Sequence, residues 1–553
     1  MKFIDVTLPR VGFDGLAPRR LAAPLGRLIA FFATLMLAGA AAAVCNDASI
    51  DLDHFYSDGW GLDAGNTRFQ TDATINQSNL PRLRLKWSVS LGRKGDHHAW
   101  PLVTRNTVFI GTQEGALLAL DRATGCERYV RQFDSDIRTA IVHHAAMING
   151  KREVLLYFGT GKGSVYAVAA RDGEVLWRVA ADVHPHTRIT GSPAIAGDTV
   201  YVPVSSYEAA VAAGPTYSCC TFRGSILALD AATGTRKWRS YSIDEPARIT
   251  GTRLLVLKER GPSGAPIWST PTIDGAGGTL YYGTGENYSL PATKTSDAII
   301  AISLTDGSRK WASQFTAGDV WNISCDLPLI SANCPDKTLG VDLDFGAPPI
   351  LTVSRAHGAV LIAGQKSGTV YAIDPATGQT RWQTSVGRGG KLGGVHWGMA
   401  VDAARNLVYV PISDRVTARD GPIQPQPGLH ALDLDTGQVV WSTVHLDDCI
   451  DNTRCDSGLS AAVTATSDLV FAGALDGWLR AYDAATGTVL WKHQTAVELR
   501  AINGELVSGG AIDVHGPMVA GDMVFITSGY GAFLQRSGNA FLAFGLDDGD
   551  TKP

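Results

Sequence analysis

The segment ILALDAATGTRKW, Ile226 to Trp238, decides the fold. Its first half alternates large apolar side chains with small or polar ones, which is the pattern of a half-buried β-strand. Asp230 and Gly234 then indicate a turn, because aspartate can bond the backbone of a turn and glycine tolerates a positive φ. A second strand carries Trp238. The segment therefore predicts a β-hairpin with a tryptophan at a fixed distance from its turn.

Variants of this segment recur eight times along the chain, with turn glycines Gly125, Gly173, Gly234, Gly307, Gly378, Gly437, Gly487 and Gly549. A tryptophan stands four residues after the glycine in six copies, at Trp177, Trp238, Trp311, Trp382, Trp441 and Trp491, and Tyr129 takes its place in the first. Intervals of roughly 50 to 70 residues suit four-stranded propeller blades with variable loops. A ring at this fixed place can dock between neighbouring blades, where one sheet alone cannot bury it.

The eighth copy, FLAFGLDDGD, lacks the tryptophan and lies near the end of the chain. The missing strand is present at the other end, where LPRLRLKWSVSLG carries Trp87. We therefore predict an all-β fold, an eight-bladed β-propeller over residues 81–553, with the N-terminal strand completing the last blade. No long amphipathic helix or linker indicates a further domain.

The N-terminal residues have the layout of a secretory signal. Arg19, Arg20 and Arg27 precede an apolar run that ends in Ala40–Ala43. A transmembrane anchor is the alternative, but the run is short and ends in alanines. We expect a signal peptide over residues 1–43, an N-terminal arm over residues 44–80, a periplasmic location and no stable membrane insertion after signal removal. With Lys+Arg 48 against Asp+Glu 53, the chain lacks the basic excess of a nucleic-acid-binding protein.

The eight cysteines of an exported chain are expected to pair, because the compartment is oxidising. Cys325 and Cys334, and Cys449 and Cys455, are close enough in sequence to close short loops. Cys45 and Cys126 would then hold the N-terminal arm. Cys219 and Cys220 are adjacent, and they could pair with each other, pair elsewhere or stay free in a core.

The repeat also resembles that of a known family, the pyrroloquinoline quinone (PQQ) dehydrogenases. WGLDAGNTRFQ, beginning at Trp60, is similar to their N-terminal signature. CCTFRG at Cys219, GRGGKLGG at Gly387, HWGMA at His396 and IDVHGPM at Ile512 are similar to the polyvinyl alcohol dehydrogenase branch of this family. The same repeat also builds a cofactor-free scaffold, an outer-membrane assembly lipoprotein. The repeat is therefore specific for the fold but says little about activity.

The resemblance implies a set of residues that contact PQQ. Trp268 would cover one face of the quinone, and a Cys219–Cys220 disulfide would cover the other. Lys366 would contact the quinone oxygens, while Arg223 and Arg138 could grip carboxylates through paired hydrogen bonds. The remaining matches are Thr190, Ser205 and Trp397. Each residue taken singly could equally be a surface charge or an ordinary strand side chain.

The resemblance also implies a calcium site and a catalytic base. Glu208 matches a calcium carboxylate, and Glu286 or Asn287 occupies the place of a family asparagine after GTG. These oxygen donors suit Ca²⁺. The family's catalytic aspartate is replaced by Asn322 in AGDVWNISC. Asparagine cannot accept a proton, so Asp319 is the nearest alternative base.

The function implied is PQQ-dependent oxidation of secondary or polymeric alcohols to ketones or aldehydes. No Cys-x-x-Cys-His haem motif occurs, so electrons would pass to a separate cytochrome c. A non-catalytic scaffold is one alternative, and a quinoprotein dehydrogenase for small alcohols or sugars is another. Asn322 favours the scaffold, whereas Trp268 and Lys366 favour an enzyme.

Overall fold

The computed structural model describes residues 44–45, 49–253, 257–327, 332–336, 338–415, 425–446 and 456–547. The expected signal peptide and the Cys449–Cys455 pair lie outside these residues. Residues from Ala42 onward form one compact unit. Among the described residues, no helix is long and apolar enough to cross a membrane.

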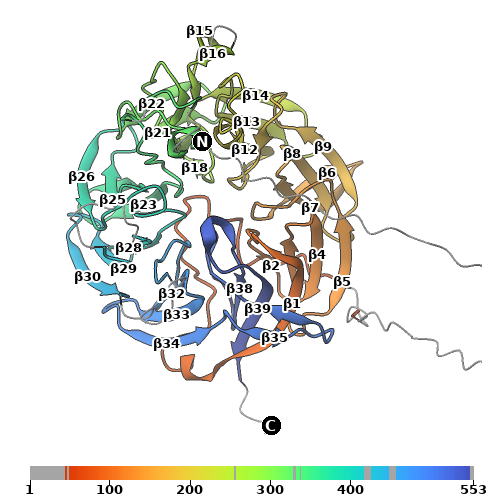
Figure 1. Cartoon of the computed structure of the whole chain (residues 1–553). Helices are drawn as coiled ribbons and strands as arrows, with labels where there is room; N and C mark the ends of the chain where they lie inside the picture. Colours follow the sequence, from red (N-terminus) through yellow and green to blue (C-terminus); the bar gives the residue numbers. More distant parts are fainter. Residues whose placement is uncertain are drawn as a thin grey trace, which may run out of the picture. The chain divides into compact units, whose positions relative to one another are not determined.

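Eight antiparallel sheets surround the centre of this unit (Figure 1). Blade 1 contains β2 (Leu102–Val103), β3 (Thr107–Gly111), β4 (Ala116–Asp121) and β5 (Glu127–Gln132), and blade 2 contains β6 (Val142–Ile148), β7 (Lys151–Gly159), β8 (Ser164–Ala169) and β9 (Val175–Ala180). Blade 3 contains β11 (Ala194–Ala196), β12 (Thr199–Ser206), β13 (Ser225–Asp230) and β14 (Arg236–Tyr241), and blade 4 contains β18 (Thr272–Asp274), β19 (Thr279–Gly283), β21 (Ala298–Ser303) and β22 (Arg309–Gln314).

Blade 5 contains β23 (Ile350–Ser354), β24 (Gly358–Gly364), β25 (Thr369–Ile373) and β26 (Thr380–Ser385), and blade 6 contains β27 (Ala400–Asp402), β28 (Leu407–Ile412), β29 (Gly428–Asp433) and β30 (Val439–Val444). Blade 7 contains β31 (Thr464–Ala465), β32 (Leu469–Gly473), β33 (Trp478–Asp483) and β34 (Val489–Gln494), and blade 8 contains β37 (Met518–Ala520), β38 (Met523–Ser528), β39 (Gly538–Leu546) and β1 (Leu83–Gly95).

Short elements decorate the loops. They are β10 (Thr187–Arg188), β15 (Arg248–Arg253), β16 (Leu257–Gly261), β17 (Ser263–Gly264), β20 (Asn287–Ser289), β35 (Glu498–Arg500), β36 (Leu506–Ser508), α1 (Glu208–Val211), η1 (Leu80–Arg82), η2 (Ile323–Asp326) and η3 (Ala532–Leu534).

The N-terminal strand closes the ring, as predicted. β1 pairs antiparallel with β39, and Trp87 stands opposite Ala543. The last blade is therefore built from both ends of the propeller. The prediction of an eight-bladed, all-β propeller is confirmed.

The repeat tryptophans join each blade to the next. The indole Nε1 of Trp177 donates to the Ala231 carbonyl at 2.9 Å, and that of Trp382 donates to the Leu434 carbonyl at 2.9 Å. The same bond is made by Trp87, Trp238, Trp311 and Trp441, and by the Tyr129 hydroxyl. The turn glycine of the next blade lies on the ring, as Gly234 lies on Trp177. A buried ring with its N–H satisfied is thus the unit of blade docking.

A second repeated contact lies at the entry to each innermost strand. One apolar residue there, which we call the plug residue, donates its backbone N–H to a carbonyl of the preceding blade. The plug residues are Ile137, Ile189, Ile267, Phe345, Val395, Leu459 and Ile512. We call the residue that follows each plug the channel position. From blade 2 to blade 8 these residues are Arg138, Thr190, Trp268, Gly346, His396, Ser460 and Asp513.

Two of the expected disulfides are present. Cys45 bonds Cys126, and Cys325 bonds Cys334. Cys45–Cys126 joins the chain before the propeller to the outer strand of blade 1, and Cys325–Cys334 closes the loop after η2. Cys219 and Cys220 bond each other.

Candidate functional site

Four of the channel positions lie on one cavity of about 510 Å³, namely Arg138, Thr190, Trp268 and His396. The other wall residues that the argument uses are Arg188, Ser205, Tyr207, Glu286, Trp321, Asp342, Asp344, Lys366, Lys391, Trp397, Tyr530 and Phe533. The cavity is within the size range of small-molecule sites. A second cavity of about 1060 Å³ shares Arg138, Arg188, Tyr207, Tyr530 and Phe533 with it.

Trp268 presents a fixed aromatic surface in this cavity. Its indole Nε1 donates to Asp344 Oδ2 at 2.9 Å. Its ring packs edge-on against Trp397, with centroids 5.1 Å apart. Gly346 lies beneath the ring, and a Cβ atom there would come within 1.9 Å of Trp268. Glycine at this channel position is therefore required for the tryptophan to lie where it does.

Three buried carboxylates meet beside Trp268. One oxygen from each of Glu286, Asp342 and Asp344 can be chosen so that all three lie within 4.8 Å of one another. Lys366 balances part of this charge, since its Nζ lies 2.8 Å from Asp342 Oδ1 and 3.2 Å from Asp344 Oδ2. Such a set of oxygen donors suits a hard cation.

The three carboxylates differ in acidity. Burial and the neighbouring Asp344 and Asp342 hold the pKa of Glu286 well above its usual range. Burial raises the pKa of Asp342 to about 7, although Lys366 opposes this. Burial also acts on Asp344, but Lys366 and hydrogen bonds from Glu286 and Trp268 bring its pKa below the usual value. Asp344 is thus the stable anion of the group.

Cationic side chains line the opposite part of the cavity. Arg138 contacts His98 Nε2 at 2.9 Å, and Arg188 pairs with Asp136 at 3.2 Å. The Nε atoms of both arginines, and the indole Nε1 of Trp397, are buried and have no hydrogen-bond partner within the described residues. Burial holds the pKa of Arg138 below its usual value. Unpaired buried donors in a cavity wall indicate a polar or anionic ligand.

Comparisons with known proteins agree with this geometry. Residues 58–332 match the family model described as glucose/ethanol/alcohol dehydrogenase, beta-propeller domain, and residues 426–552 match that of outer membrane protein assembly factor BamB. The polyvinylalcohol dehydrogenases of Pseudomonas sp and Sphingopyxis sp. are 35% and 34% identical to this chain, each over 88% of this chain and 76% of the relative.

This chain belongs to the PQQ-dependent alcohol dehydrogenases.

Solved structures agree on the fold. The quinohemoprotein alcohol dehydrogenase of Comamonas testosteroni superposes with a TM-score of 0.65 and 19% identity, over 92% of this chain and 84% of that one. A europium-containing methanol dehydrogenase gives a TM-score of 0.64 and 18% identity, over 89% of this chain and 98% of that one.

The cavity suits the cofactor of this family. PQQ is a flat tricyclic quinone with three carboxylates, so it needs an aromatic surface and several cations. Trp268 supplies the surface, and Arg138 and Arg188 supply cations on the wall. Lys366 and the three carboxylates beside Trp268 would hold the quinone edge and a cation. The groups on the cavity wall therefore fit PQQ and a cation.

Seven residues expected at the cofactor or metal lie on the cavity: Arg138, Thr190, Ser205, Trp268, Glu286, Lys366 and Trp397. Thr190 and Ser205 also bond each other, with their hydroxyl oxygens 3.0 Å apart. These residues come from blades 2 to 6, which the fold brings around one centre (Figure 1).

The other expected residues are not part of the described cavity wall. Arg223 donates to the carbonyls of Ile243 and Asp244 and stacks over Tyr241. Asn287 bridges Ser263 and Thr293. Both side chains therefore hold loops together in this structure.

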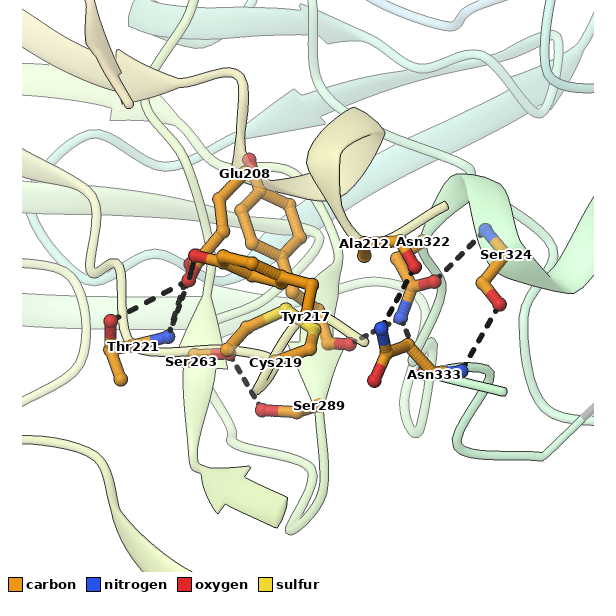
Figure 2. The surroundings of a disulfide bond; sticks show 12 residues. Glu208, Ala212, Tyr217, Cys219, Thr221, Ser263, Ser289, Asn322, Ser324 and Asn333 are labelled. Carbon is orange, nitrogen blue, oxygen red and sulfur yellow. Dashed lines mark hydrogen bonds between the residues drawn. A yellow bond between two sulfur atoms is a disulfide. The ribbon is translucent and has the colours of Figure 1, made fainter. Parts of the chain in front are cut away.

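Glu208 lies against the segment that carries the vicinal disulfide (Figure 2). Its carboxylate accepts the backbone N–H of Thr221 at 2.9 and 3.0 Å, the N–H of Phe222 at 2.8 Å and the hydroxyl of Tyr217 at 2.8 Å. Burial opposes ionisation, but these bonds and His184 bring its pKa below the usual value. Glu208 is thus bound to its own loop and not to the carboxylate group.

The vicinal pair lies in a hydrophobic cluster of blades 2 and 3. Cys219 and Cys220 are buried there with Val204, Ala212 and Phe222. The backbone of the pair exchanges two hydrogen bonds with Arg260 in β16. The described cavity wall does not include either sulfur. The adjacent cysteines do form a disulfide, but in this structure it packs beside the cavity.

Asn322 and Asp319 both support the loop that leads to the carboxylates. Asn322 caps η2 by accepting the Ser324 N–H at 3.0 Å, and it donates to two carbonyls. Asp319 accepts the N–H groups of Val341 and Leu343, each at 3.0 Å. These bonds fix the backbone on both sides of Asp342. Neither side chain is on the described cavity wall, although their neighbours Trp321 and Ile323 are.

The sequence reasoning missed Asp342, Asp344, Arg188 and His396. Asp344 directly precedes Phe345, the plug residue of blade 5. An alignment of the blades on their plug residues would have identified VDLDFG, which contains Asp342 and Asp344. Residues 323–341 separate this motif from GDVWN, the motif at which the family resemblance ended. The same alignment would have identified His396 after Val395.

Proposed function

We propose that this chain oxidises alcohols to carbonyl compounds with PQQ and a bound cation, Ca²⁺ in the simplest case. The observation that carries this proposal is the single cavity that holds Trp268, Lys366, three carboxylates and two arginines with unpaired donors. When bound, the quinone supplies the electron acceptor and the cation supplies a Lewis acid.

Asp342 is the base that we propose for the alcohol proton. Both oxygens of Asp344 already accept hydrogen bonds, Oδ1 from the Glu286 N–H and Oδ2 from Trp268 and Lys366. Within the described residues, Asp342 accepts one, from Lys366 to Oδ1. Its second oxygen is therefore the one available for a proton, and Asp319 would hold its backbone in place.

The metal ligands that we propose are Glu286 and Asp344, and Asp342 lies beside them as the base. Glu208 and Asn287 have their side-chain oxygens engaged by neighbouring loops, which argues against a direct role for them. A site with three carboxylates carries more negative charge than one with an amide ligand. The cation preference should reflect this charge.

The substrate that we propose is a secondary alcohol in a polymeric or extended chain. Relatives named polyvinylalcohol dehydrogenase support this substrate. So does the second cavity, which adjoins the first through Arg138, Tyr207 and Phe533 and leaves room for more than one unit of a chain. Small alcohols and sugars are the competing substrates.

The electron acceptor that we propose is a separate cytochrome c in the periplasm. The apolar and basic sequence at the N-terminus supports export, and the disulfides Cys45–Cys126 and Cys325–Cys334 support an oxidising compartment. The match of residues 426–552 to an assembly-factor model reflects the shared blade repeat. It covers only the last blades and includes no carboxylate of the site.

Reconstitution tests the function directly. Purified protein is incubated with PQQ and Ca²⁺, and reduction of a one-electron dye is recorded with 2-alkanols, oligomeric 1,3-diols and polyvinyl alcohol. We expect alcohol-dependent dye reduction that requires PQQ and disappears with a chelator. Trp268→Ala is the matched variant that should lose PQQ while keeping its fold. A wild-type protein that binds PQQ but reduces no dye with any alcohol would favour the scaffold function.

A further inference from the structure

Two exposed aromatic side chains lie where the two cavities meet. Tyr207 and Phe533 are each on the wall of the cofactor cavity and on the wall of the second cavity. Tyr207 is 57% exposed and Phe533 is 55% exposed, although phenylalanine is among the residues most often buried. Packing within the propeller therefore does not account for either ring.

Phe533 belongs to a turn whose backbone is held in an unfavourable conformation. Its φ is 54°, in the left-handed region that favours glycine. Such residues persist where surrounding contacts hold them, often at ligand-binding sites. Here the Gly531 N–H donates to the Gly95 carbonyl at 3.1 Å, and the Ala511 N–H donates to the Arg536 carbonyl at 2.8 Å. Both ends of the turn between β38 and β39 are thus fixed, and the turn extends over the centre of the ring (Figure 1).

Tyr207 is held in place from blade 3. It directly precedes α1, and its backbone N–H donates to the His186 carbonyl at 2.8 Å. The Arg188 guanidinium lies over its ring, 5.4 Å from the centroid. This cation–π contact orients the ring while leaving more than half of the residue exposed. Two aromatic rings from blades 3 and 8 are therefore available at the junction of the cavities.

The ionic groups of the second cavity are mixed in sign. Asp96 and Asp136 lie on its wall with Lys162, and Asp136 pairs with Arg188 at 3.2 Å. A strongly charged partner protein is matched by a surface of the opposite sign. A neutral chain of hydroxyl groups can instead donate to carboxylates and accept from cations. The wall therefore suits a neutral polyhydroxylated chain.

The position of the cofactor site leaves the second cavity to the substrate. Trp268, Lys366 and Asp342 are on the wall of the first cavity and are not on the described wall of the second. The wall of the second cavity includes Lys162 and Pro185, which are exposed, so this cavity opens to solvent. When one hydroxyl group of a long chain reaches Asp342, the neighbouring units have to lie at the junction and in the open cavity.

We propose that Tyr207 and Phe533 are the residues that select a polymeric alcohol. The hydrocarbon backbone of the chain packs against the two rings and removes apolar surface from water. Its hydroxyl groups bond the polar wall of the second cavity, and one of them lies beside Asp342. A small alcohol enters the first cavity without these contacts and gains nothing from either ring. This proposal rests on the proposed function.

The dependence of activity on chain length tests this role. Protein loaded with PQQ and Ca²⁺ is assayed with 2-alkanols and with oligomeric 1,3-diols of increasing length, at equal concentrations of hydroxyl groups. Wild-type kcat/KM should rise with length and level off once the chain spans the second cavity. Phe533→Ala and Tyr207→Ala should each lower kcat/KM for long oligomers about 10-fold, mainly through KM. Both should change kcat/KM for 2-alkanols by less than about 3-fold.

Leu534→Ala is the matched control. Leu534 adjoins Phe533, has a φ of 68° and is 93% exposed, but it is on neither described cavity wall. Alanine at either position takes the same left-handed backbone, so a backbone effect would appear in both variants. We expect Leu534→Ala to keep the wild-type dependence on chain length. Equal losses with long oligomers in Leu534→Ala and Phe533→Ala would overturn the role of the ring.

Native electrophoresis through gels that contain polyvinyl alcohol gives a readout independent of turnover. The polymer should retard wild-type protein and Leu534→Ala alike, and it should retard Phe533→Ala and Tyr207→Ala less. Undiminished retardation of both ring variants would overturn the proposal. So would a rise in KM that is confined to a cytochrome c acceptor, which would assign the rings to that partner. A wild-type protein that is retarded by the polymer but oxidises no alcohol would instead overturn the proposed function.

Discussion

Two arcs of the propeller present different chemistry at the same backbone position. In blades 2 to 5 the channel positions are Arg138, Thr190, Trp268 and Gly346, and the first three line the cavity while Gly346 makes room for Trp268. In blades 6 to 8 they are His396, Ser460 and Asp513, all buried, and His396 Nδ1 lies 2.8 Å from Ser460 Oγ. We call these the cofactor arc and the polar arc.

The difference teaches how a repeat acquires a site. The plug residue before each channel position has the same task in blades 2 to 8, to donate its N–H to the preceding blade and fill the gap between sheets. The next side chain has no such task, so it can vary without cost to the ring. The cofactor arc uses this freedom for flat and cationic surfaces, and the polar arc uses it for small or polar side chains that are buried.

The comparison depends on a closed ring, and removal of β1 should have the largest effect of any change. A protein lacking residues 83–95 loses the pairing with β39 and the docking of Trp87 on blade 1. Opening one blade exposes apolar residues of blades 1 and 8 together, so we expect no cooperative thermal transition. Circular dichroism and calorimetry measure this. A truncated protein that melts like the parent would show that closure is dispensable.

The next largest effect is expected at the end of the cofactor arc, where the base lies. Asp342→Asn should lower turnover by about 10²–10⁴-fold with PQQ content retained, because a positioned base contributes that much. Dye reduction and the absorbance of bound PQQ measure the two quantities.

Asp319→Asn is the comparison for this variant. It weakens the hold on Val341 and Leu343 but leaves the Asp342 oxygen in the cavity, so we expect a smaller loss. A near wild-type Asp342→Asn together with an inactive Asp319→Asn would return the role of base to Asp319.

The repeat could be predicted from the sequence more completely than the residues of the site. Ring closure and docking could be predicted because they depend on the local repeat. The Cys325–Cys334 disulfide could be predicted from its short spacing, and Cys45–Cys126 because these two cysteines remained once the closer pairs were assigned. Trp268 and Arg138 could be placed because their motifs resemble those of the PQQ dehydrogenases. Asp342 and Asp344 could not, because residues 323–341 separate them from the motif used to find the base.

Gly346→Ala tests whether the glycine at one channel position determines where the Trp268 ring lies at another. A methyl group at residue 346 would collide with Trp268, so the ring must leave its place. Loss of a stacking surface is worth about 1–3 kcal/mol in comparable systems, so PQQ affinity should fall by about 10- to 100-fold. Gly275→Ala is the matched control, since nothing lies within 4 Å of its added Cβ. Equal PQQ titrations of both variants would show that Trp268 is not the floor of the site.

The smallest effect is expected where sequence and structure differ most. The resemblance placed Cys219–Cys220 on a face of PQQ, whereas the pair packs with Val204, Ala212 and Phe222 and bonds Arg260. Replacing both cysteines by alanine should lower Tm, because buried contacts are lost, yet change PQQ affinity by less than about 3-fold, which is under 1 kcal/mol. Titration of apoprotein with PQQ measures this. A loss as large as that of Trp268→Ala would mean that the loop from Tyr207 to Phe222 moves when the cofactor binds and brings the disulfide onto it. The cofactor arc would then extend into a segment that lies outside the repeat.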